Sequence, residues 1–133
     1  MQEVTQMARE RLLTAAEWNI MELLWDSAPK TLMELVSALA GSTGWSKSTV
    51  ATMLSRMEDK GLVRYETAGR ARQYFPCIPR EEAAVRETAS LLDRAYHGSL
   101  GLLVSTMVEN KAVSQQELAE LYEILQKAEE DAP

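Results

Sequence analysis

The hydrophobic pattern of the N-terminal half changes its period at Gly61, and this change limits the folds open to the chain. Before Gly61, apolar residues recur every three or four positions in three short segments, which indicates amphipathic helices. After it, Leu62–Glu66 alternates apolar and polar residues, and the short aromatic run Gln73–Cys77 follows. Both runs are typical of strands, and Thr67–Arg72 between them, with Gly69 and two arginines, is predicted as a hairpin turn.

Capping signals mark where the three helices begin. Thr14–Glu17 and Thr31–Glu34 are capping boxes, in which a hydroxyl and a carboxylate each satisfy a free backbone amide. Ser46 is the predicted N-cap of the third helix, and Gly61 follows its end. Three short helices followed by a hairpin predict a winged helix-turn-helix, with the third helix as recognition helix and the hairpin as wing.

The third helix, within Trp45–Gly61, has two contrasting faces at about 100° per residue. One face is apolar and suits a core: Val50, Met53, Leu54 and Met57. The other is small and polar, with an arginine beside it: Ser48, Ala51, Thr52, Ser55, Asp59 and Arg56. A plain surface helix is one interpretation, but hydroxyl residues lower helix propensity. A face that approaches a DNA major groove requires such small polar groups.

Charge is distributed unevenly along the 133 residues. The net charge of −6 opposes nucleic-acid binding for the chain as a whole. Residues 79–133, however, hold 5 basic against 11 acidic residues, whereas residues 46–75 hold 6 basic against 3 acidic, a local balance of +3. A phosphate backbone meets the local charge, so the hairpin and third helix stay candidates for DNA contact. Arg70 and Arg72 are expected at the hairpin tip, although a solvated turn also explains a single arginine there.

Several function classes find no support in the composition. No apolar run approaches the ~20 residues of a membrane span, and no signal peptide pattern is present, so a cytoplasmic protein is expected. The one cysteine and one histidine, Cys77 and His97, have no partners for a metal site, and no nucleophile–base pair appears. We therefore expect no enzyme, no metal and no cofactor. Cys77 is predicted to be buried, and His97 to lie at a helix end or a dimer seam.

The pattern after Pro79 predicts three more helices. Ala84, Val85, Thr88, Leu91, Leu92, Ala95 and Tyr96 form one stripe, Gly98 interrupts it, and Leu100–Val108 forms a second. The capping box Ser114–Glu117 opens the last helix. Three helices of this size enclose too little interior to be stable alone, which favours a dimer over a monomeric core, although folding back on the winged helix remains an alternative. The candidate dimer contacts are Leu91, Leu92, Tyr96, Leu100, Leu103, Val104, Leu118, Leu121, Tyr122 and Leu125.

These patterns define the predicted architecture. The fold class is mostly α with a small β-hairpin. A flexible segment (1–12) precedes a winged helix-turn-helix domain (13–78), and a three-helix dimerisation region (79–130) follows.

Five segments of the sequence resemble the penicillinase-repressor family, which includes methicillin-resistance and copper-transport repressors. They are residues 13–25, 45–61, 69–76, 94–100 and 117–125. The resemblance implies a homodimeric repressor that binds double-stranded DNA at an inverted-repeat operator. It also implies DNA contacts from the third helix and wing, carried by position onto Ser46, Ser48, Thr49, Thr52, Arg56, Arg70 and Arg72. Lys47 joins this set as a phosphate contact.

Three departures from the family pattern concern specificity and induction. Ser46–Thr49 reads Ser-Lys-Ser-Thr where relatives often have Ser-Pro-Lys-Thr, so the lysine moves by about 100° around the helix. In the penicillinase branch a membrane-anchored sensor metalloprotease leads to cleavage at an Asn-Phe bond, where this chain has Thr106-Met107. The paired cysteines of the copper branch are missing, which excludes release through them. The sequence leaves the operator, the inducer and the regulated genes open, with a winged-helix protein-interaction module as the alternative function.

Overall fold

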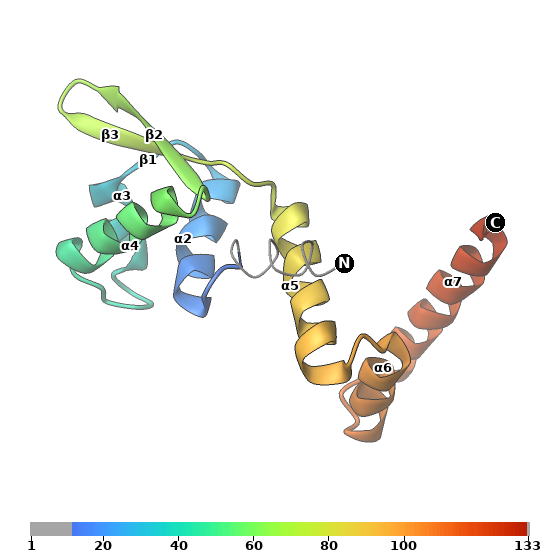
Figure 1. Cartoon of the computed structure of the whole chain (residues 1–133). Coiled ribbons are helices and arrows are strands. Elements are labelled where there is room, and N and C mark those ends of the chain that lie inside the picture. Colours follow the sequence, from blue (N-terminus) through green and yellow to red (C-terminus); the bar gives the residue numbers. More distant parts are fainter. Residues whose placement is uncertain (1–11, 133) are drawn as a thin grey trace. The chain divides into compact units, whose positions relative to one another are not determined.

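The computed structural model describes residues 12–132, so the part of the predicted flexible segment before Leu12 lies outside it. The N-terminal half contains helices α2 (Ala15–Asp26), α3 (Leu32–Leu39) and α4 (Lys47–Asp59). The predicted capping boxes are confirmed: the Thr14 and Thr31 hydroxyls accept bonds from the amides three residues later. Figure 1 shows these helices packed together beside the hairpin.

The sheet has three antiparallel strands in the order β1-β3-β2. Strands β2 (Val63–Ala68) and β3 (Ala71–Pro76) are the predicted hairpin, and β1 (Lys30–Thr31) pairs with β3 just before α3. The sequence pattern does not predict β1, because two residues are too few to form an alternating pattern.

The predicted turn over residues 67–72 was too long. Pairing continues to Ala68 and resumes at Ala71, so the loop contains only Gly69 and Arg70. Gly69 has a φ of 64°, a conformation that costs a residue with a side chain more than it costs glycine. Arg72 consequently lies inside β3, and the expectation that it sits at the tip was wrong.

The core of the N-terminal half is formed mainly by side chains of its helices. The fully buried side chains come from α2, α3, α4 and the chain just after α4: Ile20, Met21, Leu24, Leu35, Val50, Leu54, Met57 and Leu62. The partly buried Trp25 donates from its indole Nε1–H to the carbonyl of Ile78 at 2.8 Å. This order, with a strand after the first helix and a hairpin after the third, defines a winged helix-turn-helix.

Helices α5 (Arg80–Tyr96), α6 (Leu100–Glu109) and α7 (Gln115–Asp131) complete the described chain. Residue contacts divide the chain into two compact units, one up to Ser90 and one from Leu91. As predicted, the chain turns at Gly98, which has a φ of 81°, and His97 at the helix end also adopts a positive φ of 51°. The predicted capping box at Ser114 is present.

The buried positions of α5 differ from its apolar stripe. Ala83 and Ser90 are buried, whereas Val85 is 67% exposed. Ala83 and Ser90 lie seven residues apart and so share a face, while Val85 lies about 160° away from that face. The stripe of α5 therefore does not supply the core of the first unit.

Cys77 corrects another expectation, because its side chain is exposed. It follows β3 directly, its backbone N–H donates to the Leu62 carbonyl at 2.8 Å, and the next residue, Ile78, enters the core instead. Among residues 12–132, no group of His, Cys, Asp and Glu could hold a metal ion. Within the same range, no helix is both long and apolar enough to cross a membrane.

Candidate nucleic-acid interface

Helix α4 presents a fixed outer face because both its ends and its inner face are anchored. The Ser46 hydroxyl accepts the Thr49 amide at 3.2 Å and so caps the first turn. Val50, Leu54 and Met57 are completely buried. At the other end Leu62 N–H donates to the Met57 carbonyl and Gly61 N–H to the Glu58 carbonyl, the paired bonds of a Schellman cap. Gly61, with a φ of 76°, suits that cap.

A charged pair fixes the C-terminal end of α4 to the start of α2. Lys60 Nζ lies 2.7 Å from Glu17 Oε1 and also donates to the Leu12 carbonyl. Glu17 is only 6% exposed, and its carboxylate additionally accepts the Thr14 amide. The carboxylate therefore serves as both the capping group of α2 and the anchor for α4.

The outer face of α4 carries hydroxyl groups that are already partly oriented. The Thr52 hydroxyl donates to the Ser48 carbonyl at 2.9 Å, so toward solvent it offers lone pairs and a methyl group. The Ser46 hydroxyl lies 3.2 Å from that of Ser48 and 3.0 Å from that of Thr49. These short side chains leave a low surface that a base edge can approach closely.

All eight residues predicted to contact DNA are exposed: Ser46, Lys47, Ser48, Thr49, Thr52, Arg56, Arg70 and Arg72. Their basic members line two different hollows, however. Lys47, Arg70 and Arg72 line a groove of about 620 Å³ between α4, the start of α3 and the hairpin. Arg56 instead lines a separate hollow with residues of α2, on another side of α4.

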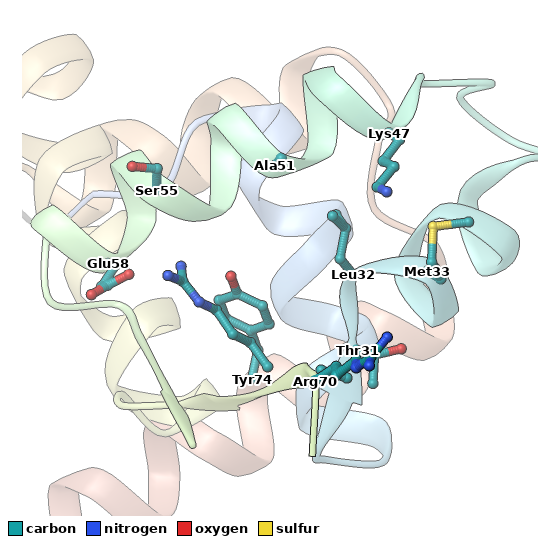
Figure 2. A pocket seen from close by; sticks show the side chains of 11 residues that line it. Thr31, Leu32, Met33, Lys47, Ala51, Ser55, Glu58, Arg70 and Tyr74 are labelled. Atoms are coloured by element: carbon teal, nitrogen blue, oxygen red, sulfur yellow. The ribbon is translucent and has the colours of Figure 1, made fainter. Parts of the chain in front are cut away.

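The groove also contains residues that the sequence analysis did not select. Met33, Glu58 and Tyr74 line it, together with Ala51 and Ser55 of α4. Figure 2 shows Lys47 reaching in from the first turn of α4, with Glu58 and Tyr74 toward the other end. The four-residue spacing of Lys47, Ala51 and Ser55 was a signal for this shared face, but the part played by the hairpin depends on strand register.

The two wing arginines have different surroundings. Arg70 is in the loop, and its side chain has no hydrogen bond, ion pair or ring contact with any other residue in the range 12–132. Arg72 lies with its guanidinium 4.2 Å from the centre of the Tyr65 ring. A hydrogen bond with Tyr74, followed by the charge interaction with Tyr65, raises the pKa of Arg72 above its ordinary value.

The opposite face of the hairpin carries a third arginine. Arg64 pairs with Glu66 at 3.0 Å and lies over the Phe75 ring. Because it is half exposed and already paired with a carboxylate, its charge is partly neutralised at that face.

The predicted dimer contacts lie in the second unit, where α6 and α7 contain no buried residue. Three of them are exposed, namely Leu100, Tyr122 and Leu125, and Leu118 is half-buried. The other six are also half-buried: Leu91, Leu92, Tyr96, Leu103, Val104 and Leu121. An apolar groove of about 550 Å³ runs between α6 and α7, lined by Leu103, Val104 and Ile124 among others.

The candidate cleavage pair lies inside α6. Thr106 is half-buried and its hydroxyl donates to the Leu102 carbonyl at 2.9 Å, whereas Met107 is 43% exposed. Both residues keep helical geometry in this state.

The order of elements and the two faces of α4 define a winged helix-turn-helix protein. The family model described as Penicillinase repressor matches residues 13–127, and the chain belongs to this family. The penicillinase repressor of Bacillus licheniformis is 31% identical over 115 residues, which cover 86% of this chain and 90% of that protein. The methicillin resistance regulatory protein MecI of Staphylococcus aureus (strain N315) is 24% identical over 86% of this chain and 94% of its own length.

Solved structures include a similar domain. The solution structure of the DNA binding domain of the repressor BlaI is 28% identical, with a TM-score of 0.49, over 53% of this chain and 85% of that one.

Proposed function

We propose that this protein is a transcriptional repressor that binds double-stranded DNA as a homodimer, at an inverted-repeat operator. The observation that carries the proposal is the exposed face of α4, which is small, rich in hydroxyls and flanked by basic groups, on a helix whose inner side is fully buried. Membership of the penicillinase repressor family supports the same function.

The division of contacts follows from side-chain chemistry. Ser48, Thr49 and Thr52 present short hydrogen-bonding groups to base edges, and each good base contact adds about 1–3 kcal/mol of discrimination. Lys47 and Arg56 lie on either side of that hydroxyl face and contact phosphates, with Ser46 at the capped start of the helix. Arg70 adds a phosphate contact from the wing. These ionic contacts supply affinity that falls as salt rises.

The second unit supplies the dimer contact. A chain that leaves Leu100, Ile124 and Leu125 more than half exposed gains free energy when a partner covers them. A two-fold dimer also places two recognition helices on the two halves of a palindrome. Joining two weak half-site binders raises affinity through effective concentration.

Release of the operator follows from loss of that dimer. A cut at or near Thr106–Met107 would separate α7 and the end of α6 from the rest and leave the winged helix intact. The protease partner proposed by analogy is a membrane-anchored sensor metalloprotease. Proteases bind extended segments, and α6 can open locally at low cost because none of its residues is buried.

A mobility-shift titration with DNA from upstream of the protein's own gene tests the proposal at two salt concentrations. We expect a shift that weakens steeply with salt, and each lost phosphate contact flattens the slope of log affinity against log salt by about 0.9. Arg56→Ala and Arg70→Ala should each show this flattening, and Lys127→Ala, a matched loss of charge on α7, should not.

A fragment ending at Ser90, which keeps the buried Ile78 and Ala83, should fold and bind the same DNA far more weakly than the full chain. Equal affinity would rule out a role for the second unit. Absence of any shift with the full chain would refute DNA binding and favour a protein-interaction module.

A further inference from the structure

The position of Arg72 on the hairpin separates it from Arg70. In the register of β2 and β3, Arg72 is opposite Thr67, and Tyr74 is opposite Tyr65. Opposed residues, and residues two apart in a strand, share a face of the sheet. Arg72 therefore lies on the face that carries Tyr65 and Tyr74, of which Tyr74 belongs to the buried core.

Although Arg72 is exposed, its guanidinium is engaged by neighbouring side chains. Its guanidinium lies over the Tyr65 ring at 4.2 Å, and the Tyr65 and Tyr74 rings are themselves 5.8 Å apart. Arg72 and Glu58 line the same groove from opposite walls, β3 and α4. Attraction by Glu58 adds to the effect of the two tyrosines in raising the pKa of Arg72.

Arg70, two residues earlier, has none of these contacts. It is exposed in a two-residue loop, and no neighbour in the described part of the chain pairs with it. Its guanidinium can reorganise around a phosphate without breaking an existing interaction, whereas that of Arg72 must first leave the Tyr65 ring.

We propose that Arg72 is a positioning residue, which braces the tyrosine face of the hairpin through its contact with Tyr65, and that Arg70 alone of the two contacts phosphate. This inference rests on the proposed function for its DNA part. It changes the sequence-based expectation that both arginines contact DNA.

The test measures the salt dependence of DNA binding by fluorescence anisotropy, with the full-length protein and a duplex from its own upstream region. Arg70→Ala should reduce the slope of log affinity against log salt by about 0.9, the loss of one phosphate contact. Arg72→Ala should weaken binding at every salt concentration and leave the slope unchanged. Tyr65→Leu, which keeps the arginine but removes its ring, should reproduce the Arg72→Ala loss.

Arg64→Ala is the matched control, because it removes the same charge from the other face of the same hairpin. Arg72→Met removes the guanidinium from the Tyr65 ring but keeps a long unbranched side chain, and it serves if Arg72→Ala does not fold. A slope reduction in Arg72→Ala or Arg72→Met equal to that in Arg70→Ala, with Tyr65→Leu unaffected, would overturn the proposal.

Hydrogen exchange of the DNA-free protein separates this proposal from the proposed function. If Arg72 holds the wing, the amides of β2 and β3 should exchange faster in Arg72→Ala than in Arg70→Ala or the wild type. Unchanged exchange would overturn the positioning role even if the protein binds DNA. If Arg72→Ala exchanges faster but the wild-type protein does not bind DNA, the proposed function and the phosphate assignment of Arg70 are refuted, while the positioning role of Arg72 stands.

Discussion

The two compact units of this protein differ most in what they bury. The unit up to Ser90 has a core of buried side chains from three helices and the hairpin, together with an anchored outer face on α4. In the described part of the unit from Leu91 onward, no residue is fully buried, although apolar side chains are frequent. The first unit can satisfy its own hydrophobic groups, whereas the second requires something to cover them.

This difference indicates a division of labour. A helix that reads DNA must keep its geometry in the absence of DNA, which a complete core provides. A region that controls assembly can lack a buried core of its own. Its stability then depends on the partner subunit and is lost when that subunit is removed. Four predictions test this contrast, beginning with the largest expected effect.

Ile124→Asp should prevent dimerisation through the second unit without unfolding the first unit. Ile124 is 61% exposed and lines the apolar groove between α6 and α7, where a covered carboxylate would be desolvated beside Glu117 and Glu120. Sedimentation equilibrium should show monomers, and affinity for a two-half-site duplex should fall about 10²–10⁴-fold with the loss of avidity. Glu123→Gln, one residue earlier on α7, is the control. A dimer of unchanged affinity would place the interface elsewhere.

Leu54→Ala should cost the first unit about 2–5 kcal/mol of unfolding free energy, because a fully buried leucine leaves a cavity in the core. Urea denaturation followed by tryptophan fluorescence measures it. Leu125→Ala removes the same atoms at a site 57% exposed, and in the Ile124→Asp background, without a dimer, it should change the free energy by less than about 0.5 kcal/mol. Similar losses at the two sites would contradict the contrast between the units.

Lys60→Met should destabilise the first unit by about 1–3 kcal/mol, since the nearly buried carboxylate of Glu17 loses its charged donor. Lys47→Met makes the same change on an exposed site of the same helix and should be nearly neutral for stability. Adding Glu17→Gln to Lys60→Met should recover part of the loss, as measured by urea denaturation. If the two lysine variants are equally stable, Lys60 does not anchor α4.

The smallest effect concerns the start of α3. The backbone hydrogen bond from Thr31, and then the hydrogen bond with its side chain, lower the pKa of Glu34 below its ordinary value. The folded pKa is thus lower than the unfolded one, so this contribution to stability is complete above about pH 4.3 and is lost as pH falls through the folded pKa. An NMR titration should show Glu34 with a lowered midpoint, which rises in Thr31→Val. An unchanged midpoint in that variant would refute the contribution of the Thr31 hydroxyl, since the valine keeps the backbone N–H that bonds Glu34.

The features that could be predicted from the sequence depend on neighbours along the chain. The capping boxes at Thr14, Thr31 and Ser114 and the glycine stops at Gly61 and Gly98 each involve residues within a few positions, so they mark the helices wherever the helices pack. The inner face of α4 followed from helical period alone, and so did its exposed hydroxyl face.

The sequence by itself therefore determined the order of the helices and the hairpin, the helix boundaries and the two faces of α4. Tertiary structure decided the features that depend on strand register and on contacts between residues far apart in the chain. Pairing of β2 with β3 placed Arg72 on the tyrosine face, β1 formed only because β3 was beside it, and Cys77 became exposed because Ile78 entered the core. A shift of one residue in strand register moves every side chain to the opposite face of the sheet. The local pattern of a short strand is too weak to fix that register.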